Sequence, residues 1–338
     1  MFFEWKSKLG QSNLTAAFLL STLLTLCMCV LEIRGTDIVQ FSGISDGSAG
    51  VVLGSEKVGY KLLIADDEDA NLRIYPLSGG QPEEIISVKE ELSGIKGKKE
   101  FDLEGAARVG DTVYWISSHG RNSRGKQQLS RHVFFATRVD DETLSVEVIG
   151  KPFQGLLEAI ISEPGLKEFR LEKSTLLEPK KPNGFNIEGL AATPEGTLLI
   201  GFRNPIPRDR ALLVPLKNPE EIISGTKPVF GKPITLDLGG LGIRDICYCE
   251  SGYLIVAGPY DKGICKLYFW AGKLENAPVE VLRSFPSGFS AEIIFFFPGK
   301  PDKKWFAVSD DGSKLVGGVE NKKLPLSQRT FRGVWGEL

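Results

Sequence analysis

An acidic residue precedes a pair of apolar runs at five places along the chain, and this recurrence constrains the fold more than any other feature. The clearest copies are residues 101–107, which contain Glu104-Gly105, and residues 185–192, which contain Glu188-Gly189. In both copies a turn and a second apolar run follow. Looser copies carry Asp46, Asp245 and Glu292. A repeat of this length and strand content is typical of a β-propeller.

The spacing of the five acidic markers predicts the number of blades. The markers at 46, 104, 188, 245 and 292 are separated by 58, 84, 57 and 47 residues. A four-stranded blade needs about 40 to 60 residues, so we expect an all-β propeller with five blades, or six if the longest interval hides another. In that interval residues 153–179 are predicted to be an insertion on the channel face. Its helical spacing of apolar residues predicts a short amphipathic helix.

The two ends of the propeller are predicted to meet in one blade. Residues 37–41 lead into the first marker as residues 279–285 lead into the last one. We therefore expect residues 37–41 to form the outer strand of the final blade, paired with residues 330–335. Such closure removes exposed strand edges, which otherwise promote aggregation.

Residues 1–35 differ in character from the rest of the 338-residue chain. Lys6 and Lys8 precede an uncharged stretch at 9–31, which is the pattern of an export signal or, uncleaved, of a membrane anchor. A lipoprotein signal is a further alternative, although the bulky Leu26 before Cys27 departs from its pattern. All three predict an exported body that is periplasmic, extracellular or anchored facing outward. Residues 36–338 are then a single propeller domain, which touches a membrane only through the N-terminal segment.

Composition excludes some classes of partner. The formal net charge is −2, so nothing indicates nucleic-acid binding. Separately, we expect the protein to be a monomer. The cysteines outside the N-terminal segment are Cys247, Cys249 and Cys265, an odd number that predicts no disulfide framework. We expect them to be small buried hydrophobic residues.

The repeated acid predicts where chemistry takes place. In a propeller the start of the first strand and the end of the second lie on the same face, so the five markers and Asp66 should surround one channel mouth. Carboxylates so close repel one another, and a bound cation, arginine partners such as Arg203 and Arg244, or protonation must offset this. Calcium suits an oxygen-only set of ligands. The candidate metal ligands are Asp46, Asp66, Glu104, Glu188, Asp245 and Glu292; the alternative is that each acid caps backbone N–H groups.

Three other residues are expected to face a small anionic ligand or substrate above that cation. His119 follows the strand predicted at 112–117, Arg121 lies in a basic loop after it, and Arg203 ends another second strand. Guanidinium groups bind carboxylates and phosphates in bidentate geometry. We therefore assign His119, Arg121 and Arg203 as candidate catalytic residues.

Several motifs resemble the bacterial domain-of-unknown-function family 3616. They are Asp46-Gly-Ser-Ala, Ala65-Asp-Asp-Glu, Glu104-Gly-Ala-Ala, Ser118-His119-Gly-Arg121, Ile187-Glu188-Gly-Leu, Gly201-Phe-Arg203-Asn-Pro and Leu241-Gly-Ile-Arg244-Asp245. The resemblance implies a propeller and brings no established activity. More distantly, the Glu-Gly strand starts are similar to those of esterase-like phytases and calcium-dependent lactonases. This similarity implies a metal-dependent propeller.

Two functions follow as hypotheses. The first is a calcium-dependent hydrolase of an anionic ester, phosphoester or lactone, with the carboxylates holding the ion and the arginines binding substrate. The second is a non-catalytic propeller that binds a ligand or partner and has an acidic channel satisfied by protein groups. An open metal position at the base of a cleft would favour the hydrolase.

Overall fold

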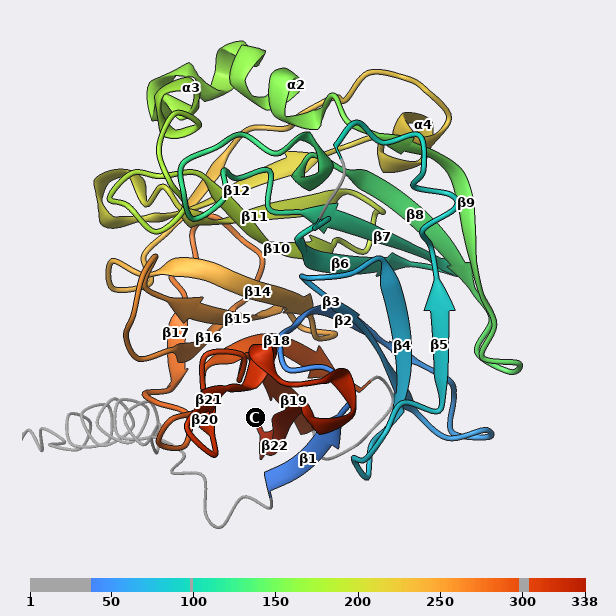
Figure 1. Cartoon of the computed structure of the whole chain (residues 1–338). Helices are drawn as coiled ribbons and strands as arrows, with labels where there is room; N and C mark the ends of the chain where they lie inside the picture. The colour runs from blue at the N-terminus through green and yellow to red at the C-terminus, as the bar shows by residue number, and fades with distance from the viewer. Residues whose placement is uncertain (1–37, 98–99, 298–303) are drawn as a thin grey trace, which may run out of the picture. The chain divides into compact units, whose positions relative to one another are not determined.

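The computed structural model describes residues 38–97, 100–297 and 304–338, and these form a ring of five four-stranded antiparallel sheets (Figure 1). The fold is therefore the predicted five-bladed β-propeller. Blade 1 contains β2 (Gly47–Leu53), β3 (Lys61–Asp66), β4 (Asn71–Pro76) and β5 (Glu84–Ser87). Blade 2 contains β6 (Leu103–Val109), β7 (Thr112–Ser117), β8 (Phe134–Val139) and β9 (Val146–Phe153).

The remaining blades continue the ring. Blade 3 contains β10 (Asn186–Ala192), β11 (Leu198–Asn204), β12 (Ala211–Leu216) and β13 (Ile234–Leu236). Blade 4 contains β14 (Gly242–Tyr248), β15 (Tyr253–Gly258), β16 (Lys266–Trp270) and β17 (Val279–Leu282). Blade 5 contains β18 (Ala291–Phe296), β19 (Lys304–Ser309), β22 (Thr330–Glu337) and β1 (Ile38–Ser42), in that order from the centre outward.

The hydrophobic core consists of the seams between neighbouring blades. Five clusters of buried side chains each join two adjacent sheets; the cluster between blades 2 and 3, for example, contains Phe134, Phe185 and Phe202. Strands buried on both faces explain why the apolar runs are nearly continuous, as in β11, where all seven residues are buried. The inner strands are held in place from both sides.

Every inner strand carries a shift in its pairing register near its first residues. The shift skips one residue in each of β2, β6, β10, β14 and β18, and the skipped residues are Ser48, Glu104, Glu188, Arg244 and Glu292. A bulge of this kind redirects one side chain out of the normal alternation. The structure therefore aligns these five positions with one another.

The interval from Glu104 to Glu188 holds one blade and an insertion, so there is no sixth blade among the described residues. The predicted helix is α2 (Leu156–Ser162), followed by a 3-10 helix at Pro164–Phe169 and by α3 (Leu171–Ser174). Leu156, Leu157 and Ile160 pack into the cluster between blades 2 and 3, beside Phe134 and Phe185. The chain after α3 then reaches the channel face at Glu178, Pro179 and Lys180.

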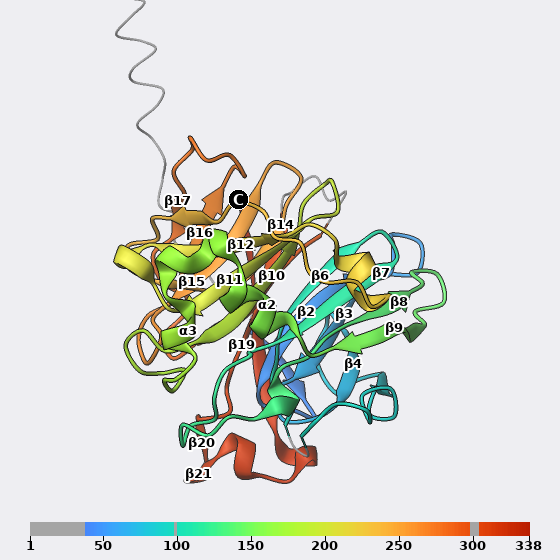
Figure 2. The ribbon, with the colours of Figure 1, turned by 90° about the horizontal axis from the view of Figure 1, so that it is seen from above.

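Short helices and one small hairpin lie in the connections between the strands. They are α4 (Pro219–Ile223), the hairpin of β20 (Leu315–Val316) and β21 (Val319–Glu320), and 3-10 turns at Leu129–Arg131, Pro207–Asp209, Asn321–Lys323 and Leu326–Gln328. Figure 2 shows β20 and β21 projecting from the ring, outside the five sheets. None of the helices in the described part of the chain is long and apolar enough to cross a membrane. The predicted export signal or anchor at 1–35 lies outside the described residues.

Ring closure follows the prediction. Strand β1 pairs antiparallel with β22, and Phe41 lies opposite Phe331. Their rings stack at 4.8 Å between centroids, and Tyr75 of blade 1 meets both edge-on. The N-terminal strand thus completes blade 5 and packs that blade against blade 1.

This closure makes a testable prediction. Phe41→Ala should lower the free energy of unfolding by about 3 to 5 kcal/mol, because the ring is fully buried and leaves a cavity at the closing seam. Ile38→Ala, in the same strand but 50% exposed, should cost less than about 1 kcal/mol. Urea denaturation of both variants measures the difference; equal losses would show that β1 does not close the ring.

Candidate functional site

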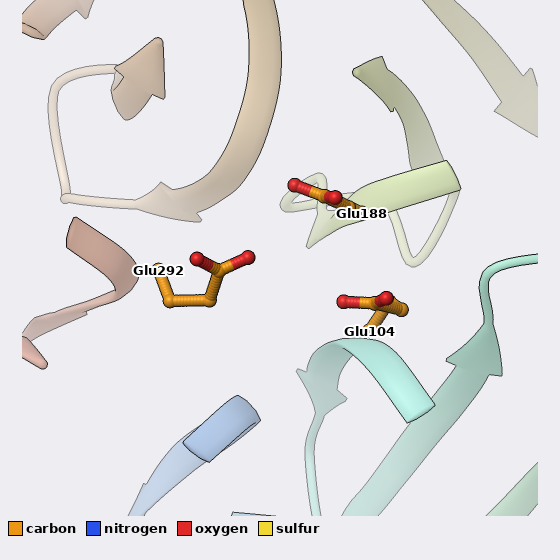
Figure 3. A group of neighbouring side chains, drawn as sticks. All are labelled: Glu104, Glu188 and Glu292. Carbon is orange, nitrogen blue, oxygen red and sulfur yellow. The ribbon is translucent and has the colours of Figure 1, made fainter. Parts of the chain in front are cut away.

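Three carboxylates from three blades meet at the mouth of the channel. Glu104, Glu188 and Glu292 each offer an oxygen, and these oxygens lie within 4.8 Å of one another. Figure 3 shows the three side chains converging from separate inner strands. Glu188 and Glu292 are buried, whereas Glu104 is partly exposed. The register shifts of β6, β10 and β18 place them there, since each is the residue that its strand skips.

The three charges oppose one another strongly. At an effective dielectric constant of about 20, two full charges at such a separation repel by roughly 3.5 kcal/mol. Burial, and after it the charges of Glu188 and Asp102, raise the pKa of Glu104 well above its usual value. Without a cation, Glu104 therefore tends to hold a proton.

Two arginines offset part of the charge. Arg203 Nη1 donates to Glu188 Oε1 at 2.5 Å, and Arg244 forms an ion pair with Glu292. Arg244 Nε also lies 3.7 Å from Glu188 Oε2, too far for a hydrogen bond. Both of those atoms are buried and lack a hydrogen-bond partner. Among the described residues, Glu104 has neither a hydrogen bond nor an ion pair, so the cluster is only partly satisfied.

The triad lies in a cleft of about 360 Å³. Nine carboxylates line it: Asp46, Asp67, Glu100, Asp102, Glu104, Glu178, Glu188, Glu292 and Asp310. Six basic side chains accompany them: Arg121, Arg131, Lys180, Arg203, Arg244 and Lys322. Because the acids outnumber the basic side chains, the electrostatics of this cleft favour a bound cation.

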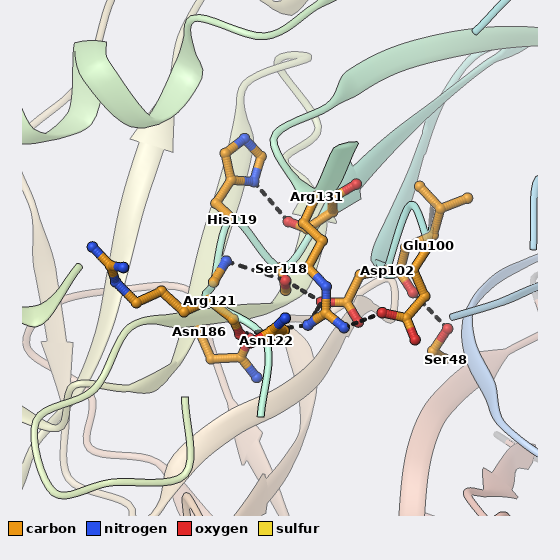
Figure 4. A network of polar contacts seen from close by, with 12 residues as sticks. Ser48, Glu100, Asp102, Ser118, His119, Arg121, Asn122, Arg131 and Asn186 are labelled. Atoms are coloured by element: carbon orange, nitrogen blue, oxygen red, sulfur yellow. Dashed lines mark hydrogen bonds and ion pairs between the residues drawn. The ribbon is translucent and has the colours of Figure 1, made fainter. Parts of the chain in front are cut away.

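A second polar network supports the wall formed by blade 2. Asp102 forms an ion pair with Arg131 at 2.9 Å and accepts a hydrogen bond from Ser118, and Arg131 also binds Glu100 (Figure 4). Burial raises the pKa of Asp102 to about 6, with Arg131 opposing that shift. The Ser48 hydroxyl donates to Leu103 O at 2.5 Å and joins blade 1 to this wall.

A pair of aspartates crosses the seam between blades 1 and 5. Asp46 pairs with Asp310 as an isolated bridge, and the Ser45 hydroxyl donates to Asp46 at 2.6 Å. Burial and then the charge of Asp310 raise the pKa of Asp46 to about 7. Nearby, Asp67 Oδ1 is buried without a hydrogen-bond partner, and burial raises the pKa of Asp67 well above its usual value. Asp46 therefore exchanges a proton near neutral pH.

Two predicted ring members do not reach the cleft. Asp245 lies one residue past the skipped Arg244, so it points into the seam and accepts hydrogen bonds from the backbone N–H groups of Ile246 and Ile294 at 2.8 Å. Asp66, the last residue of β3, lies opposite Gly47 of β2 and accepts a hydrogen bond from the Glu68 N–H, while Asp67 lines the cleft instead. For these two acids the capping alternative describes the geometry.

The predicted anion-binding residues are also placed differently. His119 is buried, stacks on His132 at 5.7 Å and does not line the cleft. Burial lowers its pKa to about 3, so it is neutral. Arg121 lines the cleft, but its guanidinium donates to Thr175 O and Gly125 O and extends away from Asp102 (Figure 4).

Arg203 is likewise engaged by protein groups. Besides Glu188 it donates to Pro259 O at 3.0 Å and to Asp261 O at 3.3 Å. It therefore positions Glu188 and the loop after β15. In the described cleft wall, the basic residues without an ion pair to a carboxylate are Arg121, Lys180 and Lys322.

The sequence patterns gave an incomplete set of site residues. Arg244, expected only as a partner of the acids, takes the channel position in blade 4, and Ser48 takes it in blade 1, where acids were expected. Asp102, Arg131 and Lys322 were not singled out. The available signal was the alignment of each inner strand on its Glu-Gly copy, which matches Arg244-Asp245 to Glu188-Gly189.

Residues 138–293 match the family model described as Protein of unknown function (DUF3616), which confirms the predicted resemblance. Among curated proteins, none matches this sequence.

Solved structures similar to this chain include enzymes of several kinds. Glutaminyl cyclase of Myxococcus xanthus is 11% identical with a TM-score of 0.46, over 89% of this chain and 95% of that one. An exo-β-1,3-galactanase of Phanerochaete chrysosporium is 9% identical with a TM-score of 0.46, over 89% of this chain and 64% of its own. A putative gluconolactonase is 11% identical with a TM-score of 0.40, over 91% and 94%.

Buried acids give the fold a distinct pH dependence. Burial raises the pKa of Asp66 to about 7 and that of Asp245 to about 8. A carboxyl with a raised pKa stabilises the fold at low pH, and this contribution is lost as pH rises through the folded pKa. The lowered pKa of His119 makes stability rise with pH instead, but only below the ordinary histidine pKa of 6.5. Stability should therefore fall from about pH 7 to about pH 8.5.

Urea denaturation in the presence of a chelator measures this fall. Asp245→Asn should flatten the dependence, because the substituted side chain cannot ionise. Asp209→Asn, at an exposed position outside the cleft, should keep the wild-type slope. Stability that rises over this interval would contradict the assignment of protonated buried acids.

Proposed function

We propose that the protein is a metal-dependent hydrolase whose divalent cation, calcium, is held by Glu104, Glu188 and Glu292. The observation that carries the proposal is the convergence of three carboxylate oxygens within 4.8 Å at a cleft. Calcium accepts six to eight oxygen ligands in flexible geometry, and the cleft offers oxygens without histidine. Asp46 lines the same cleft and is a further acidic group on this face.

The unsatisfied atoms of the triad support a cation there. Glu188 Oε2 is buried without a hydrogen-bond partner, a state that costs free energy unless something binds it. Glu104 would release its proton on binding, so affinity should rise with pH. Because Arg203 and Arg244 already offset part of the charge, we expect weak binding, with a dissociation constant of about 10⁻⁴ to 10⁻³ M as in extracellular calcium modules.

An anionic ester, phosphoester or lactone fits the remaining groups. A cation bound at the triad supplies a Lewis acid for a carbonyl or phosphoryl oxygen. Lys180 and Lys322 stand in the cleft wall and are suited to binding an anionic group. The Asp46–Asp310 pair, with the pKa of Asp46 near 7, is suited to accept the proton of an attacking water. Arg203 and Arg131 orient carboxylates.

A second candidate is a non-catalytic propeller that binds a ligand or partner. The ion pairs of Arg203 with Glu188 and of Arg244 with Glu292 favour it, since they fill part of the channel mouth with protein groups. In that case the arginines replace the cation. The two candidates differ in the response of the protein to calcium.

Export by residues 1–35 belongs to the same proposal. A weak calcium site is filled only where calcium is abundant, and the extracellular modules with such affinities work in that environment. A membrane contact outside this N-terminal segment is not required.

The proposal predicts calcium-dependent hydrolysis. In a panel of anionic esters, phosphoesters and lactones, at least one should be hydrolysed, and a chelator should abolish the reaction. Glu104→Gln should lower kcat/KM by at least about 100-fold, since it removes a metal ligand while leaving no arginine unpaired. Glu178→Gln, in the same cleft wall but outside the triad, should retain activity within about threefold.

Two results would count against this function. If the chelator leaves the rate unchanged, the carboxylates do not act through a cation. If no panel member is hydrolysed and calcium does not bind, the non-catalytic propeller, with its carboxylates paired to the arginines, is the better description.

A further inference from the structure

The far end of the channel holds a second cavity, of about 390 Å³. It shares no lining residue with the acidic cleft. Its walls come from the second halves of the inner strands, where Val52, Ala106, Leu190, Ile246 and Phe295 represent the five blades. The same five strands thus carry polar residues at one end and mostly apolar residues at the other.

Small residues on the inner strands explain why this end is hollow. Blades 2 and 3 contribute the pairs Ala106-Ala107 and Ala191-Ala192, and blade 1 contributes Gly50. A Cβ on Gly50 would lie 2.9 Å from Phe295 Cζ, so glycine is what lets that ring rest against β2. No larger side chain from these positions fills the space.

The charges at this cavity are already paired or in solvent. Arg108 donates to both oxygens of Asp141, at 2.8 and 2.7 Å, and the Gly54 N–H donates to Asp141 at 2.8 Å. Arg108 also donates to Gly110 O at 2.8 Å. Glu250, the other charged residue of the lining, is exposed. A charged ligand would find no unpaired counter-ion within the cavity.

Four aromatic residues line the cavity. They are Phe295 and Phe296 of β18, Tyr60, and Tyr248, which is 39% exposed. Aromatic rings bind other rings in stacked or edge-on arrangements, with a gain beyond area burial alone. Water in an apolar cavity lacks the two to four polar partners that hold it, so a ligand displaces it readily.

We infer that this cavity is a second binding site, for a small uncharged molecule that contains an aromatic ring. It is independent of the proposed hydrolase, because no residue of the acidic cleft lines it. The volume lies within the range of small-molecule pockets, and the lining has their usual composition, mostly apolar with few polar groups.

Equilibrium dialysis with indole as the probe tests this site. Indole should bind saturably at one site per chain, and the charged analogues indoleacetate and tryptamine should bind at least about tenfold more weakly. Ala192→Phe should weaken indole binding by about tenfold or more, because the new ring occupies the cavity. Ala271→Phe is the matched control, a half-buried alanine outside the lining, and should bind like wild type.

Cooperative urea unfolding of each variant shows that a loss of binding is not a loss of fold; if Ala192→Phe fails this check, Val52→Phe replaces it at another half-buried lining position. Glu104→Gln should bind indole normally, which separates this site from the acidic cleft. The inference is overturned if wild type shows no saturable binding, if the charged analogues bind equally well, or if folded cavity-filling variants bind indole like wild type.

Discussion

Repulsion among carboxylates at the channel mouth is the constraint on which the rest of the polar structure depends. Five inner strands converge, each skips one residue, and three of the five skipped residues are glutamates. Arg244 and Ser48 occupy the other two positions, so the ring contains one internal cation. Arg203 adds a second from the end of β11. These two arginines leave part of the negative charge uncompensated, and a bound cation would offset that part.

The propeller architecture can hold these repelling side chains close together. Each inner strand packs between two hydrophobic seams, and the stacked rings of Phe41 and Phe331 close the last of them. A strand fixed from both sides can hold a side chain in an unfavourable environment, because the loss is spread over many buried contacts. Register shifts at the strand starts then direct those side chains toward the axis.

The fold followed from the sequence, and the site followed only in part. The recurrence of an acid before paired apolar runs predicted five blades, the position of the insertion helix and the pairing of the two ends of the propeller. Glu104, Glu188 and Glu292 were three of the six acids expected around the channel mouth, and each is the residue that its strand skips. In blade 4 the marker chosen was Asp245, one residue beyond the skipped Arg244. A one-residue shift turns a strand side chain to the other face, and the sequence does not show where a bulge falls.

Side-chain surroundings explain the other differences. His119 was expected at the cleft because it follows β7, but its backbone has φ of 55° and its ring stacks on His132. Arg121 and Arg203 were expected to be available to a ligand, yet backbone carbonyls and Glu188 accept their hydrogen bonds. Sequence patterns place a residue along a strand, whereas its partners depend on loops from other blades.

The central claim is that a cation completes the Glu104–Glu188–Glu292 cluster, and calorimetric titration of the purified protein with calcium tests it most directly. Wild type should bind one ion weakly, with protons released on binding, and Glu104→Gln should show no binding in the same range. If wild type binds no calcium, or if Glu104→Gln binds it equally well, then Arg203 and Arg244 are sufficient partners for these carboxylates and the account is contradicted.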